Sequence, residues 1–106
     1  MTHCRIFKIT FPNEFSKENF DAYIVKSNET NEIKKDFIRM GMTVTSNQGI
    51  YINIFESKND AKSAWGKRGE ELYAKIKSLG AKVEKFEGDT HFLNINTSLD
   101  LSKYKV

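Results

Sequence analysis

The fold of this chain is read most directly from one stretch, residues 48–55, with the sequence QGIYINIF. Branched and aromatic residues favour a β-strand, and successive side chains of a strand point to opposite faces of the sheet. The two faces of this strand would carry Ile50, Ile52 and Ile54 on one side and Tyr51, Asn53 and Phe55 on the other. A strand with one face in water alternates apolar and polar residues. This one does not, so both of its faces are expected to be covered.

The sequence before this stretch predicts a strand and a helix. Residues 5–11 are rich in β-forming residues and stop at Pro12, which cannot donate to a sheet ladder. A helix is expected from about residue 16 to residue 35, with a kink or break near residues 28–31, where the sequence is polar. Gly41 marks the latest point at which this helix can end.

A short strand and a turn connect that helix to the opening stretch. Residues 42–45, Met-Thr-Val-Thr, favour a strand, and residues 46–49, Ser-Asn-Gln-Gly, are typical of a turn. Because residues 50–55 follow at once, the two strands are expected to form a hairpin.

The second helix has the clearest boundaries in the sequence. Ser57 and Asp60 form a Ser-x-x-Asp start that resembles a capping box, and Gly80 stands where a glycine commonly terminates a helix. Two internal glycines, Gly66 and Gly69, each weaken the helix by up to about 1 kcal/mol relative to alanine. Their usual explanation is the close approach of a neighbouring backbone.

The order of the expected elements decides the fold class. The last strand material lies within residues 82–87 and 90–96, interrupted at Gly88-Asp89. The chain therefore reads β-α-β-β-α-β, which predicts an α+β, ferredoxin-like fold with a four-stranded antiparallel sheet. Right-handed crossovers place the first and third strands at its centre. One domain spanning residues 1–106 accounts for the whole length.

Composition narrows the class of protein. The chain has one cysteine, which excludes a disulfide framework and suits a reducing, cytoplasmic location. No apolar run approaches the roughly 20 residues of a membrane span, so no membrane association is expected. Acidic residues are interleaved with basic ones and the net charge is +3, so no stripe of like charge suggests a nucleic-acid partner. With two histidines, and with His3 and Cys4 on opposite faces of one strand, no metal site is expected.

The isoleucine face of residues 48–55 needs a cover that one layer of helices cannot supply. With one face of residues 6–9 it would leave a patch of roughly several hundred Å², at or above what monomers tolerate. Covering each large apolar side chain is worth about 1.5–3 kcal/mol. The simplest cover is a second copy of the same sheet, so Ile50, Ile52 and Ile54 are the expected homodimer interface.

Residues 48–56, followed by Asp60-Ala61-Lys62, resemble the third strand and second helix of an RNA-recognition motif. The base-stacking positions of that family would fall on Ile50 and Ile52, and aliphatic side chains have no π face for a base. Gln48 replaces the leading cation of its motif. The resemblance covers the strand without its RNA chemistry, and RNA binding is the third of the functions considered.

A second resemblance spans nearly the whole chain. The chain is similar to the dimeric α/β-barrel superfamily, the ferredoxin-like domains related to antibiotic-biosynthesis monooxygenases, and most of all to its branch of small mono-oxygenase-like proteins. The residues that carry this resemblance are Gly49-Ile50-Tyr51, Phe55, Ala61, Ala64, Leu79-Gly80, and Asn94 and Asn96 with Leu99. It implies dimers that pair sheet to sheet, with a pocket between helices and sheet in which phenolic or anthrone substrates react with oxygen without flavin or metal.

Such a pocket must bind an aromatic ring, stabilise an oxyanion and move a proton. Trp65 would supply a stacking wall, or else simply pack in the core. Asn53 would point toward the helices and donate to a substrate oxygen, or else bond to a neighbouring loop. Tyr51, on the same face, would offer a phenolic donor or span the core and its rim.

Three further residues complete the candidate site. His91 would shuttle a proton near neutral pH, or else be an exposed or satisfied strand histidine. Tyr73 is expected at the helix edge, and Arg68 would hold an anionic substrate or form an intersubunit salt bridge. The candidate catalytic residues are thus His91 and Asn53, and the candidate substrate-binding residues are Trp65, Tyr51, Tyr73 and Arg68.

The sequence therefore predicts a homodimer that binds a small aromatic molecule and acts as a cofactor-independent monooxygenase. A non-catalytic dimer that responds to stress or to a ligand through the same pocket is the alternative. A converging acid–base pair would separate the two, and only His91 offers one in the sequence.

Overall fold

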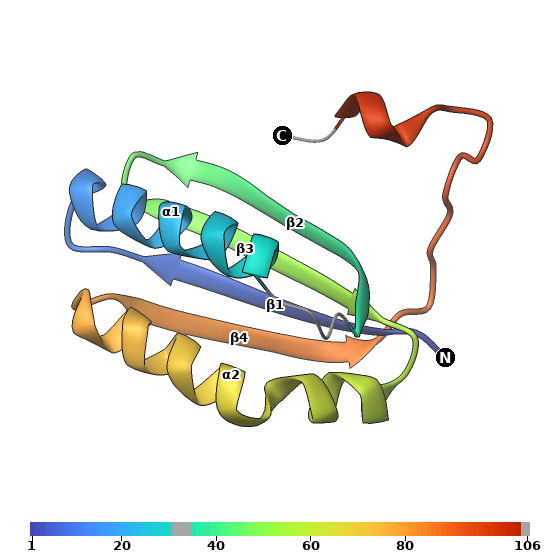
Figure 1. Ribbon diagram of the computed structural model, residues 1–106, viewed down its shortest axis with the longest axis horizontal. Helices are drawn as coiled ribbons and strands as arrows, with labels where there is room; N and C mark the ends of the chain where they lie inside the picture. Colours follow the sequence, from blue (N-terminus) through green and yellow to red (C-terminus); the bar gives the residue numbers. More distant parts are fainter. Residues whose placement is uncertain (31–34, 105–106) are drawn as a thin grey trace.

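A computed structural model describes residues 1–30 and 35–104 of the chain (Figure 1). Its elements are β1 (His3–Thr10), α1 (Glu14–Thr30), β2 (Asp36–Thr45), β3 (Gln48–Phe55), α2 (Lys58–Ser78), β4 (Lys82–Asp89) and the 3-10 helix η1 (Leu101–Tyr104). The four strands form one antiparallel sheet in the order β2-β3-β1-β4, with β1 and β3 at its centre. The expected ferredoxin-like β-α-β-β-α-β fold is confirmed.

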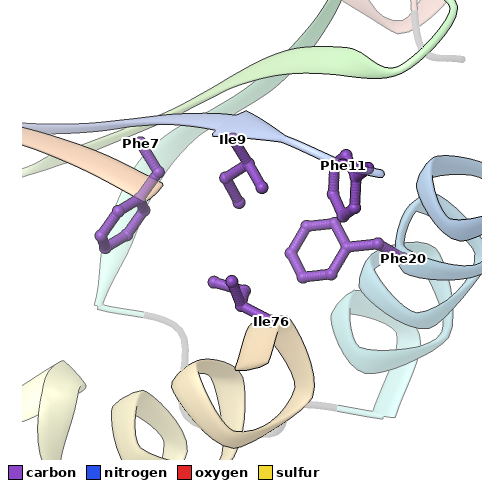
Figure 2. Packing of buried hydrophobic residues seen from close by; sticks show 5 residues of the cluster. All are labelled: Phe7, Ile9, Phe11, Phe20 and Ile76. Carbon is purple, nitrogen blue, oxygen red and sulfur yellow. The ribbon is translucent and has the colours of Figure 1, made fainter. Parts of the chain in front are cut away.

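The two long helices lie on the same face of the sheet (Figure 1). Side chains of β1 are alternately buried and half-buried, because every second one points toward the helices. The buried cluster contains Phe7, Ile9 and Phe11 from the first strand and its end, with Phe20 from α1 and Ile76 from α2 (Figure 2). The core is therefore a single layer between β1 and the helix pair.

The first crossover differs from the expectation. α1 continues without interruption through residues 28–30 and ends at Thr30, and residues 31–34 lie outside the described residues. β2 begins at Asp36, six residues before the expected strand at 42, so the expectation of a helix reaching residue 35 is wrong. The helix ends well before Gly41, the latest end that was expected. The spacing of Phe37 and Met40 fits a helix and a strand equally, and pairing with β3 decides in favour of the strand.

The last strand is also shorter than expected. β4 runs without a break through Gly88 to Asp89, and residues 90–96 form no strand. The reason lies in β1, whose first residue, His3, is paired with Asp89. Beyond that pair the backbone of β4 has no neighbouring strand to bond, and the chain leaves the sheet after Thr90 N–H donates to Thr2 O at 2.8 Å.

α2 has the predicted ends. The Ser57 hydroxyl accepts from Asp60 N–H at 3.1 Å as the N-cap, and Gly80 adopts φ +69° directly after the helix. Gly66 interrupts the helix with φ +23° and ψ −135°, which L-residues rarely adopt. Gly69 was expected to allow the close approach of a neighbouring backbone, but what lies close to it is a side chain. A Cβ at this position would lie 2.2 Å from the indole ring of Trp65.

Both long helices of the described chain lie on one face of the sheet, so neither covers the second face. In an antiparallel sheet directly paired residues share a face, and one row of paired residues across all four strands contains Met40, Ile52, Ile6 and Phe86. Met40 and Phe86 are 53% and 54% exposed. We call this surface the open face. Ile50 and Ile54 belong to it too, because they pair with Met42 and Ile38. None of the described helices is both long and apolar enough to cross a membrane.

Replacing Gly69 by alanine should destabilise the chain although alanine is the better helix former. The gain of up to about 1 kcal/mol in helix propensity is outweighed because a methyl group 2.2 Å from the indole forces Trp65 to move, which typically costs about 1–3 kcal/mol. Denaturant unfolding of Gly69→Ala measures the change. In a Trp65→Leu background the same substitution should cost less or stabilise, and equal costs in both backgrounds would contradict the packing argument.

Candidate functional site

A cavity of about 710 Å³ lies between the helix pair and the sheet, on the side of β2 and β3. Its apolar wall includes side chains of β1, α1 and α2, among them Phe7, Phe20, Tyr23, Trp65 and Leu72. Its polar wall is formed mainly by β3 and its neighbours. This volume is within the range of small-molecule sites, which are mostly apolar with a few placed polar groups.

Trp65 lines the cavity and is also tied into the core. Its ring lies 5.7 Å from that of Phe7 and 5.1 Å from that of Tyr73, and Gly69 lies directly beneath it. The Arg5 guanidinium and the Lys85 ammonium each lie 4.9 Å from its ring centre. Packing and cation–π contacts therefore fix the indole in place.

Arg5 is a charged residue at the floor of this site with only 6% of its surface exposed. It donates to Ala61 O at 2.9 Å and forms an ion pair with Glu87, its neighbour across β1 and β4. Burial alone would raise the pKa of Glu87, but the hydrogen bond and charge of Arg5 outweigh it and lower that pKa. Arg5 is thus satisfied by the protein itself.

The first polar group of β3 is Tyr51. Its hydroxyl donates to Asp21 Oδ1 on α1 at 2.5 Å, and Lys17 Nζ donates to Asp21 Oδ2 at 2.7 Å and to Thr43 Oγ1 at 3.1 Å. Burial, together with the hydrogen bond to the Asp21 carboxylate and its charge, raises the pKa of Tyr51 far above its usual value. Tyr51 is therefore held as a neutral phenol.

The second polar group of β3 is Asn53. Its Nδ2 donates to Asp36 Oδ2 at 2.7 Å. Arg39 donates to the same carboxylate twice, from Nε to Oδ2 at 2.6 Å and from Nη2 to Oδ1 at 2.8 Å. The Asp36 side chain is only 2% exposed. Burial alone would raise the pKa of Asp36, but the hydrogen bonds from Arg39 and Asn53 and the Arg39 charge lower it overall. Asp36 is therefore ionised at neutral pH.

Four of the candidate residues from the sequence line the same cavity: Asn53, Trp65, Tyr51 and Arg68. Arg68 is exposed and spans from α2 to α1, where its Nη2 donates to Ser27 Oγ at 2.5 Å. Tyr73 does not line the cavity; its ring stands behind Trp65, and edge-on to Phe7 at 6.2 Å. Their roles toward a ligand stay predictions.

His91 is not brought to this cavity. It is exposed and lines a smaller hollow of about 300 Å³ with Cys4, Ile6, Phe86 and neighbouring residues at the end of β4. His91 therefore lies apart from the cavity that Asn53 lines, because β4 ends at Asp89 and residue 91 belongs to no strand. Burial raises the pKa of the nearby Cys4 thiol.

The two carboxylates that hold the polar groups of β3 were not predicted from the sequence. Asp21 stands on α1, where an acidic residue usually faces solvent, and Asp36 lies in the segment expected to follow a helix. The one available signal was on β3 itself, since buried Asn and Tyr side chains require partners. Among the described residues no cluster of three or more His, Cys, Asp or Glu side chains is suited to hold a metal ion.

No protein-family model matches the chain, and its sequence matches no curated protein. Solved structures are similar in fold. SnoaB, a cofactor-independent oxygenase from Streptomyces nogalater, superposes with a TM-score of 0.67 at 9% identity over 87% of this chain and 95% of its own. The ActVA-Orf6 monooxygenase of Streptomyces coelicolor, in complex with Nanaomycin D, has a TM-score of 0.64 at 12% identity over 88% and 92%.

A dimeric ferredoxin-like protein from an uncultured marine organism has a TM-score of 0.69 at 13% identity, over 91% of this chain and 93% of its own. At identities this low, the structural similarity establishes the fold alone, and function has to be argued from the site. The chain has the ferredoxin-like fold of the antibiotic-biosynthesis-monooxygenase-like proteins, and the resemblance seen in its sequence is confirmed at the level of the fold.

Proposed function

We propose that this chain is a homodimeric protein that binds a small hydroxylated aromatic molecule between its helices and its sheet, and that the bound molecule reacts there with oxygen without a cofactor. The observation that carries the proposal is the cavity of about 710 Å³, walled by aromatic rings on one side and by Tyr51 and Asn53 on the other. Support comes from the shared fold with a cofactor-independent oxygenase and a monooxygenase.

The reaction class fits what the cavity offers. In an anthrone-type substrate, a CH₂ group flanked by aromatic rings reacts with O₂ to give a carbonyl group and water, so that one oxygen atom enters the substrate and the other leaves. Such substrates are electron-rich and supply the electrons themselves. The protein would bind the rings against the wall near Trp65 and hold the substrate hydroxyl groups at β3, which orients the substrate for the reaction.

Binding without catalysis is the second candidate, and one observation favours it. Among the described residues that line the cavity there is no histidine. Two of its carboxylates, Asp21 and Asp36, each already accept from two side chains, and the third, Glu71 on α2, is exposed. A carboxylate held in this way is a weak base. Turnover would then depend on the acidity of the ligand or on the exposed Glu71, whereas a ligand-responsive binding protein needs no base.

The dimer part of the proposal rests on the open face and on the C-terminal arm, residues 90–104. The arm leaves the sheet after β4 and runs clear of it (Figure 1). Its apolar side chains include Phe92, Leu93, Ile95, Leu99 and Leu101, which are 39–77% exposed. An open face and an arm that are both apolar and uncovered are more than a monomer of this size usually shows. A two-fold pairing of open faces would cover Ile52 and its row.

Oxygen uptake and ligand binding can be separated in one panel of phenols, quinols and anthrones. We expect ligands to quench Trp65 fluorescence with micromolar affinity and some of them to consume oxygen. Asn53→Ala should lower affinity or turnover by about tenfold, the value of one hydrogen bond of about 1.4 kcal/mol. The matched control is Asn59→Ala, at an exposed asparagine on α2. Binding with no oxygen uptake would establish the second candidate, and no binding at all would contradict both.

The dimer is tested by charge on the open face. Phe86→Lys places a charge on a residue already 54% exposed in one copy, so it should leave the fold intact and weaken dimerisation at least about tenfold by burying an unpaired charge. Ile52→Lys should act more severely and yield an aggregation-prone or unfolded monomer. Phe15→Lys, on α1 and 75% exposed, is the control. Light scattering at micromolar concentration gives the result, and a monomeric wild type would overturn this part of the proposal.

A further inference from the structure

A β-bulge decides where the side chain of Asp36 points. In a regular strand, residues three apart lie on opposite faces, so Asp36 and Arg39 would be separated by the sheet. The pairing of β2 with β3 shifts between Asp36, opposite Phe55, and Ile38, opposite Ile54. Between these two pairs β2 moves on by two residues and β3 by only one, so β2 has one extra residue. The extra residue reverses the face of the sheet on which Asp36 lies. Asp36 and Arg39 therefore both face the cavity.

The bulge creates a rigid clamp beside Asn53. Arg39 lies directly opposite Asn53 across the strand pair and holds Asp36 by two parallel hydrogen bonds of 2.6 and 2.8 Å. This bidentate geometry fixes both position and orientation of the carboxylate. Since the Asp36 side chain is 2% exposed, water does not compete for its oxygens. The atom of Asn53 that meets Asp36 is thereby determined.

An ionised carboxylate only accepts hydrogen bonds, so the amide of Asn53 must present its NH₂ group to Asp36. One of the two N–H groups of Nδ2 is spent on that bond, the second stays on the same nitrogen, and the carbonyl oxygen Oδ1 is left on the other side of the amide. Within the described part of the chain, Oδ1 takes part in no hydrogen bond, and it is not one of the fully buried polar atoms that lack a partner. It is an acceptor available to whatever enters the cavity.

Tyr51, two residues away on the same strand face, follows the same rule. Its only proton is donated to Asp21 at 2.5 Å, so the phenolic oxygen has only lone pairs to offer to a ligand. β3 therefore presents two acceptors to the cavity, each oriented by a carboxylate from another element. Sequence alone suggested the reverse, with both side chains as donors.

We infer that Asp36 is a positioning residue that orients the amide of Asn53 with its carbonyl oxygen toward the cavity, so that the cavity selects ligands donating a hydrogen bond from a neutral hydroxyl group. This inference rests on the proposed function and specifies its ligand. It favours the protonated phenol over both the phenolate and the methyl ether, because neither of these can donate to Oδ1. Arg39 shares the role by holding Asp36.

The test compares a naphthol with its methyl ether, which have the same rings and differ in one donor. The wild type should bind the naphthol about tenfold more tightly. Asp36→Asn keeps the volume but allows either atom of the Asn53 amide to face it, so the preference should fall below about threefold. Glu84→Gln, which removes an exposed carboxylate on β4, should leave the preference unchanged. An unchanged preference in Asp36→Asn overturns the inference while the proposed function stands.

A second measurement needs neither ligand nor variant. In proton–nitrogen NMR spectra of the wild type at neutral pH, the side-chain amide protons of Asn53 should exchange slowly with water and resonate downfield, as expected for donation to a buried carboxylate. If Asn53 shows the fast exchange of a solvated amide, the positioning role of Asp36 is wrong. If neither naphthol nor ether binds, the proposed function fails, and the Asn53 spectrum alone then decides whether Asp36 orients the amide.

Discussion

β1 is paired along its whole length on both edges, with β3 on one side and β4 on the other, and the rest of the molecule is organised by the alternation of its side chains. Phe7 and Ile9 point toward the helices and form the core with Phe20 and Ile76, whereas Ile6 points to the open face. The length of β1 also sets the length of its neighbours, since β4 ends where His3 ends the pairing. The helix face supplies a core and a cavity, and the same alternation necessarily leaves an apolar face uncovered.

The features predictable from sequence were those specified by local chemistry. Pro12 lies just past the end of β1, Ser57 caps α2, and Gly80 terminates it. These could be predicted because each residue acts through its own backbone or on a neighbour within three residues. The start of β2 is a different case. Phe37 and Met40 satisfy a helical period as well as a strand, and what decides between the two is the ladder to β3, which is distant information.

The candidate site was predictable to the same degree. Alternation along β3 places Tyr51 and Asn53 on the helix side, and the structure has both at the cavity wall with Trp65. The side chains that orient them could not be found in this way. Asp36 reaches the cavity through a bulge, and a one-residue irregularity in pairing has no signature in the sequence of β2. The orientation that we infer for Tyr51 and Asn53 therefore reverses the proton roles assigned from residue type alone, because a group's role depends on which of its atoms the protein has already used.

This arrangement ties the polarity of the cavity to the packing of three elements. Tyr51 is oriented from α1 through Asp21, and Asn53 is oriented from β2 through Asp36. Both carboxylates are balanced by cations, Lys17 and Arg39, so each polar group of β3 is held by a neutral pair rather than by a lone charge. A pair of this kind keeps the wall free of net charge at the point where a ligand would bind, and it makes hydrogen-bond direction, instead of charge, the property by which the cavity discriminates. Any movement of α1 or β2 against β3 would therefore change the orientation of these polar groups as well as the volume of the cavity.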